Sequence, residues 1–242
     1  MYFRLVLLLC ALVLSGCDEH AWNDPYPNQS ATGNILYRDF SEQPKHLDPA
    51  RSYSANEWEL IGNIYEAPLD YDYVKRPYEL APVTAESVPE PTYDPVTKIS
   101  TYRIKIRPNI RYQPHPAFAQ DPNGKYYYHN LTAKQASAYR KIGDFPHTGS
   151  RELKAADYVY QLKRLADPRV NSVIYGYFTP YIVGLTELRQ QLSGAYKNSN
   201  SKAELDLRPY EFAGAKVIDD YTYEIKINGK YPQFKFWLAM PM

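Results

Sequence analysis

The sequence is poor in cysteine and lacks the short motifs that mark common catalytic and cofactor sites. Its 242 residues contain two cysteines, Cys10 and Cys17, and both lie within the first 17 positions. The rest of the chain therefore has neither a disulfide framework nor thiol chemistry. The patterns G-x-S-x-G, H-E-x-x-H, C-x-x-C, G-x-G-x-x-G and the P-loop are also missing. We therefore expect no enzyme activity, no catalytic residues and no cofactor.

The chain also lacks an excess of charge of one sign and a long hydrophobic run. Its formal net charge is +1, which removes the electrostatic argument for a nucleic-acid partner. The apolar run 5–14 is too short to span a bilayer in a folded protein. Hydrophobic residues make up 44% of the chain, which is enough for a packed core. We expect a monomer of one or two domains.

The first 17 residues have the pattern of a bacterial lipoprotein signal peptide. Arg4 precedes the apolar run, which ends in a Leu-Ser-Gly-Cys sequence that resembles a lipobox. In this interpretation Cys17 carries the lipid, with palmitate-type acyl chains that hold the protein at a membrane. A plain signal peptide with an incidental cysteine is the alternative. Asp18 resembles an inner-membrane retention signal, so we expect a periplasmic protein anchored to the inner membrane.

Residue spacing predicts two strands and two helices. Residues 100–107 and 221–227 alternate apolar with polar side chains, as half-buried strands do. Residues 153–168 place an apolar stripe on one helix face, and Pro168 ends the helix. A second helix is predicted after Ser54, which has the spacing of a capping box with Glu57. Its apolar residues favour a core stripe over a binding site: Trp58, Ile61, Ile64 and Tyr65.

Four segments in register resemble the peptide-binding lipoproteins of ABC importers. They are HLDPA at 46–50, IYEAPL at 64–69, LKAADYVYQLKRLADP at 153–168, and 214–241 from GAKVIDDYTYEIKI to WLAMP. In the same order they resemble bacterial extracellular solute-binding protein family 5, the oligopeptide, dipeptide and nickel binders. The resemblance covers residues 35–242, but only the first part of the longer chain typical of the family.

The resemblance implies an α/β fold of the type II periplasmic binding protein kind, truncated to its N-terminal portion. The expected division of the chain is a signal peptide at 1–17, a tether at 18–32, part of lobe I at 33–54 and 212–242, and the small lobe II at 55–211. Residues 113–152 stand where the family has a short turn, so we interpret them as an insertion. The first strand is expected at 33–40. A third lobe would lie beyond residue 242.

The resemblance also suggests where a ligand would bind. In the family the loop after the first strand borders the ligand cleft, and its backbone meets the bound peptide. That role falls here on Glu42, Gln43 and Pro44, and the alternative is a solvated loop. Some relatives bind nickel chelates, but the spacing of His115, His129 and His147 favours ordinary loop histidines, so we expect no metal site.

We therefore expect a binding lipoprotein that captures a peptide or a related small solute and delivers it to a membrane permease and its ATPase. Two alternatives stay open, a periplasmic hydrolase or wall-modifying enzyme, and a non-transporting truncated lipoprotein. The ring-rich stretch at 175–181 fits either a cleft lining or packing between elements. Peptide length, nickel chelate and sugar are all possible ligands within the family.

Overall fold

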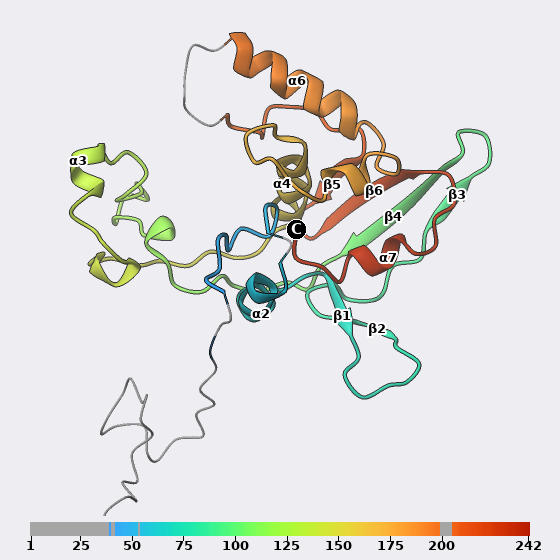
Figure 1. Ribbon diagram of the computed structural model, residues 1–242, viewed down its shortest axis with the longest axis horizontal. Coiled ribbons are helices and arrows are strands. Elements are labelled where there is room, and N and C mark those ends of the chain that lie inside the picture. The colour runs from blue at the N-terminus through green and yellow to red at the C-terminus, as the bar shows by residue number, and fades with distance from the viewer. Residues whose placement is uncertain (1–38, 40–41, 53, 199–204) are drawn as a thin grey trace, which may run out of the picture. The chain divides into compact units, whose positions relative to one another are not determined.

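The computed structural model describes residue 39 and residues 42–52, 54–198 and 205–242. From Glu42 to Met242 these residues belong to one compact unit (Figure 1). The predicted lipid site at Cys17, the tether at 18–32 and, apart from Asp39, the strand at 33–40 lie outside the described residues. Within the described part of the chain, no helix is long and apolar enough to cross a membrane.

The main sheet has four antiparallel strands in the order β3-β4-β6-β5. These strands are β3 (Thr92–Asp94), β4 (Ile99–Lys105), β5 (Ala215–Asp219) and β6 (Thr222–Asn228). The β4–β6 ladder is continuous from Ile99 opposite Asn228 to Lys105 opposite Thr222. A separate hairpin pairs β1 (Leu69–Tyr71) with β2 (Leu80–Pro82). The two strands predicted from alternation, at 100–107 and 221–227, are therefore confirmed as β4 and β6, and they pair directly with each other.

The core lies where one face of β4 and β6 meets the helix α4 (Ala155–Ala166) (Figure 1). The alternation places these side chains inside, at no more than 1% exposure: Tyr102, Ile104, Ile106, Tyr223, Ile225 and Ile227. The predicted stripe of α4 is buried as well. The helix stops at Ala166 because Pro168 favours an extended conformation at Asp167, which has φ −67° and ψ 118°.

Three further helices cover this core, and contacts near them indicate the role of the ring-rich stretch at 175–181. They are α5 (Tyr175–Phe178), α6 (Leu185–Asn198), which packs on α4, and α7 (Phe234–Trp237). Phe178 is buried and its ring meets that of Trp237 edge-on at 4.9 Å. Tyr181 stacks on Tyr231 at 4.2 Å. These contacts favour packing between elements for this stretch.

The helix α2 (Ala55–Ile64) begins where the sequence predicts it, but its apolar stripe is not a core stripe. Ile61 is fully buried and Trp58 is half-buried, whereas Ile64 and Tyr65 are 51% and 44% exposed. The helix ends at Ile64, and Tyr65 turns to φ −113° and ψ 140°. Helical spacing therefore no longer sets the direction of Tyr65, and the prediction of a continuous stripe is wrong.

The stretch 113–152 forms an excursion whose two ends pair through the isolated bridges Arg111–Glu152 and His115–Gly149. It contains two short 3-10 turns, η1 (Pro116–Phe118) and η2 (Ile142–Asp144), and the helix α3 (Ala133–Ala136), which Thr132 and Gln135 cap with a reciprocal pair of hydrogen bonds. His129 stacks on Tyr126 at 3.9 Å, and His147 stacks on Tyr127 at 4.4 Å. Stacked rings thus hold much of this segment together.

One buried cation ties the chain after α6 to α4. Lys163 is 9% exposed, and its ammonium donates to the backbone carbonyls of Leu207, Arg208 and Tyr210 at 3.2, 3.2 and 2.5 Å. Burial lowers the pKa of Lys163 below its ordinary value. The Leu207 carbonyl also accepts from the N–H of Tyr210, whereas those of Arg208 and Tyr210 have no second donor among the described residues.

Replacing this donor tests how much it stabilises the fold. We expect Lys163→Met to lower the free energy of unfolding by about 2–3 kcal/mol, because the carbonyls of Arg208 and Tyr210 lose their donor without a substitute. The control Lys197→Met changes an exposed residue of α6 and should stay within about 0.5 kcal/mol of the wild type. Urea denaturation followed by circular dichroism measures both. Equal midpoints for the two variants would contradict the role given to Lys163.

Candidate functional site

The candidate site is the loop 42–46, which lies beside the first turn of α2. Glu42 and Gln43 are exposed and Pro44 is half-buried. The Asn56 side chain donates to the backbone carbonyl of Glu42 at 3.1 Å, which fixes one end of the loop. Within the described residues, the backbone N–H and C=O of Gln43 form no hydrogen bond. The three residues that the sequence singles out are therefore together at the surface, with open backbone groups between fixed ends.

A single carboxylate fixes the other end of this loop. Glu57 Oε1 accepts the backbone N–H groups of Lys45 and His46 at 2.9 and 2.8 Å, and Oε2 accepts the hydroxyl of Ser52. Glu57 is only 4% exposed. The Ser52 hydrogen bond is the largest of the interactions that lower the pKa of Glu57 to about 2. The carboxylate is therefore charged at any pH in which the protein would work.

This arrangement corrects the predicted capping box. Ser54 is the residue before α2, but its hydroxyl accepts no backbone N–H of the helix. The Glu57 carboxylate accepts from the backbone of the loop, and the side chains of Ser52 and Ser54 both help to lower its pKa. The physical reason is that two backbone donors and the Ser52 hydroxyl converge on one carboxylate, which satisfies more of its acceptor sites than a reciprocal cap would.

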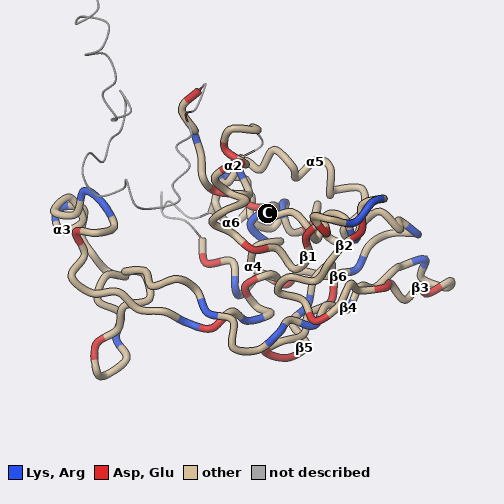
Figure 2. Tube along the Cα trace, turned by 90° about the horizontal axis from the view of Figure 1, so that it is seen from below, with Lys and Arg blue, Asp and Glu red and all other residues tan. Residues whose placement is uncertain are grey.

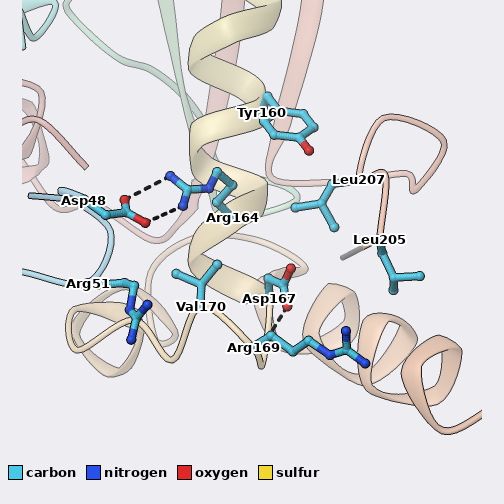
Figure 3. A pocket seen from close by; sticks show the side chains of 9 residues that line it. All are labelled: Asp48, Arg51, Tyr160, Arg164, Asp167, Arg169, Val170, Leu205 and Leu207. Carbon is cyan, nitrogen blue, oxygen red and sulfur yellow. Dashed lines mark hydrogen bonds and ion pairs between the residues drawn. The ribbon is translucent and has the colours of Figure 1, made fainter. Parts of the chain in front are cut away.

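An ion pair connects the turn after the loop to α4. Arg164 donates to both carboxylate oxygens of Asp48, at 3.0 and 2.5 Å (Figure 3). Burial alone would raise the pKa of Asp48, but the Arg164 guanidinium and the N–H of Ala50 lower it overall. The backbone carbonyl of Asp48 also accepts from the N–H groups of Arg51 and Ser52. The turn 48–52 is therefore held both by its own backbone and by α4.

A small pocket with a volume of about 100 Å³ lies beside this ion pair (Figure 3). Its charged groups are largely engaged with one another: Asp167 accepts the N–H of Arg169 and the hydroxyl of Tyr196, and the guanidinium of Arg169 lies 3.9 Å from the centre of the Tyr196 ring. Ligand sites are usually roughly 300–1,000 Å³. The pocket is therefore too small for a peptide, and the loop 42–46 is the better candidate.

The surface around the loop suits binding by hydrogen bonds. Acidic and basic positions are interspersed along the described chain, without a large region of one sign (Figure 2). Among the described residues, no group of three or more histidine, cysteine or acidic side chains is arranged to hold a metal ion. What the loop offers a ligand is backbone donors and acceptors together with the exposed side chains of Glu42 and Gln43.

Comparisons with known proteins give structural matches only. No family model matches the sequence, and no curated protein matches it. Listeria monocytogenes OppA bound to peptide is 18% identical, with a TM-score of 0.46, and the match covers 81% of this chain and 28% of that one. The Escherichia coli murein tripeptide binding protein MppA is 16% identical, with a TM-score of 0.48, and the match covers 83% of this chain and 28% of that one.

A third match, the periplasmic oligopeptide-binding protein OppAIV from Borrelia burgdorferi, is 15% identical with a TM-score of 0.48, over 81% of this chain and 28% of that one. The chain thus spans less than a third of the length of these solved structures. These three are peptide-binding proteins. The described residues of this chain combine helices with β-sheet, as the sequence predicts. The division into lobes stays a prediction.

The sequence suggests the loop as a candidate but does not indicate the residues that hold it. Asp48 and Arg164 lie 116 positions apart, in two of the segments that carry the family resemblance. Opposite charge alone does not pair two residues so far apart in the chain, so the ion pair is found only in the structure. Nothing in the sequence distinguishes Glu57 from a helix-capping glutamate, so its contacts with residues 45, 46 and 52 could be found only in the structure.

The ion pair gives a prediction with a definite pH dependence. We expect Arg164→Gln to lower the free energy of unfolding at pH 7 by about 1–2 kcal/mol, since the partners are about one-third exposed and solvent screens the pair. Because the pKa of Asp48 is lowered by folding, this contribution is present above its ordinary value of 3.8 and is lost as the pH falls through the folded-state value.

The control for this prediction is Arg208→Gln, which breaks the more exposed pair with Asp206. We expect it to have almost no effect at either pH. Denaturant unfolding at pH 7 and near pH 3 measures both variants. An Arg164→Gln effect as large at pH 3 as at pH 7 would show that the ion pair is not the cause.

Proposed function

We propose that the chain is a substrate-binding lipoprotein of an ABC importer, or the N-terminal portion of one, and that it binds peptides or a related small solute. The observation that carries the proposal is the backbone of Gln43, which lies in an exposed loop between two fixed ends and forms no hydrogen bond within the described residues. An extended peptide can pair with such a backbone whatever its side chains are. A loop that is ordered before binding also has less conformational entropy to lose.

The proposal includes a lipid anchor and membrane partners. The lipobox-like sequence ending at Cys17 supports a lipid anchor, and Asp18 supports retention at the periplasmic face of the inner membrane. The ligand would pass from the binding cleft to a permease driven by an ATPase. These partners are inferred from the four-segment sequence resemblance, which also carries the choice of peptides as the first ligands to test.

The binding prediction separates backbone from side-chain recognition. In calorimetric titrations of the full-length chain with di- to pentapeptides, we expect Gln43→Ala to bind within about threefold of the wild type, since its backbone is intact. We expect Gln43→Pro to bind about tenfold more weakly, because proline has no N–H to donate. Unfolding midpoints serve as the control for correct folding.

Two outcomes of this titration would contradict the proposal. The first is the absence of heat with every peptide tested on the wild-type chain. The second is Gln43→Pro binding as well as the wild type while Gln43→Ala is impaired, since that pattern would assign recognition to the glutamine side chain or to another surface.

The anchor is tested separately. We expect mass spectrometry of the membrane fraction of a bacterial expression host to find a diacylglyceryl group on Cys17, and we expect Cys17→Ser to move the protein out of that fraction. A matched Cys10→Ser variant should remain anchored, because it changes the apolar run and not the lipidated position. Membrane association that survives Cys17→Ser would rule out this mode of anchoring.

A further inference from the structure

Glu57 is a buried acidic residue that forms no ion pair within the described part of the chain. Its carboxylate accepts hydrogen bonds from Lys45, His46 and Ser52, which come from the loop 42–46 and from the turn that follows it. The carboxylate therefore lies where α2, the loop and the turn meet. From this geometry we propose that Glu57 is a positioning residue, which holds the backbone of the loop in the form that receives the ligand. The inference rests on the proposed function.

The loop has few other interactions that could order it. It contains no strand or helix, and Glu42, Gln43, Lys45 and His46 are all exposed. Asn56 restrains the carbonyl of Glu42, which leaves the N–H groups of Lys45 and His46 as the restraints on the far side of Gln43. Without Glu57 these N–H groups can turn to water at little cost to the fold, so the main consequence is a larger number of loop conformations.

A disordered loop must be ordered again when a ligand binds. That ordering is subtracted from the interaction free energy, so affinity falls although Glu57 itself touches no ligand. This separates a positioning role from a purely structural one. A structural role would change the unfolding midpoint of the whole chain, whereas a positioning role changes the loop amides and the affinity.

The chemistry of the carboxylate suggests a conservative replacement. A glutamine at position 57 keeps one oxygen that can accept from Lys45 and His46, and the Ser52 hydroxyl can rotate to accept from the new amide group. Glu57→Gln should therefore keep the loop in place, whereas Glu57→Ala removes both acceptor oxygens. Glu66→Ala is the matched control, because Glu66 is exposed just beyond α2 and its side chain makes no hydrogen bond within the described residues.

The experiment measures two properties of the full-length chain for each variant. Amide hydrogen exchange at Lys45 and His46 is measured without ligand, and peptide affinity is measured by calorimetry. For Glu57→Ala we expect exchange at these two amides and the dissociation constant to rise about tenfold each. For Glu57→Gln and Glu66→Ala we expect both to stay within about threefold of the wild type. If Glu57→Ala fails to fold, Ser52→Ala provides a milder test, with an expected smaller rise in both quantities.

The possible results are distinguishable. Unchanged exchange at Lys45 and His46 in Glu57→Ala would overturn the inference, because Glu57 then does not order the loop. Faster exchange with unchanged affinity would overturn it too, because the loop order then does not matter for binding. If the wild type binds no peptide, the proposed function fails together with the ligand role of Glu57, and the exchange data alone then decide whether Glu57 orders the loop.

Discussion

The pairing of β4 with β6 is the constraint on which the other elements depend. The two strands are more than a hundred residues apart in the chain, yet they pair without interruption from Ile99–Asn228 to Lys105–Thr222. A slip of one residue in this register would turn the buried side chains of one strand away from the core, and α4 would lose part of the surface on which it packs. The register of this ladder therefore fixes α4, and α4 carries the side chain of Arg164 toward the turn that follows the loop 42–46.

The candidate site depends on electrostatic restraints because its chain segment has little apolar surface to bury. Asp48 and Glu57 hold the segment at two points, one through an arginine of α4 and the other through backbone and hydroxyl donors. Both carboxylates have pKa values below their ordinary range, so both keep their charge near neutral pH. A loop held in this way therefore keeps these restraints near neutral pH.

The regular elements were predictable where their period could be read locally. The alternation in 100–107 and 221–227 and the helical stripe of 153–168 follow from spacing alone, and the cap formed by Thr132 and Gln135 spans only three residues. The predictions that fail, the capping box and the apolar stripe of α2, both relied on spacing along the chain alone. Local spacing predicts a reciprocal cap between Ser54 and Glu57, whereas the Ser54 hydroxyl caps no N–H and Glu57 accepts from backbone groups up to twelve residues away. The side chains of Ile64 and Tyr65 carry the apolar signal of a core, but the end of α2 leaves them exposed.

The same restraints determine what kind of recognition the described residues can provide. The loop presents the backbone of Gln43, and the neighbouring pocket of about 100 Å³ is too small to enclose a peptide. Backbone pairing contributes affinity that is largely independent of ligand sequence, whereas choice among side chains needs separate pockets. Under the proposed function, this part of the protein therefore supplies a general contact to the ligand main chain, and selectivity has to arise on surfaces other than the loop 42–46. The two fixed ends of the loop then contribute more to affinity than its side chains do, because a backbone hydrogen bond is strong only while its geometry is maintained.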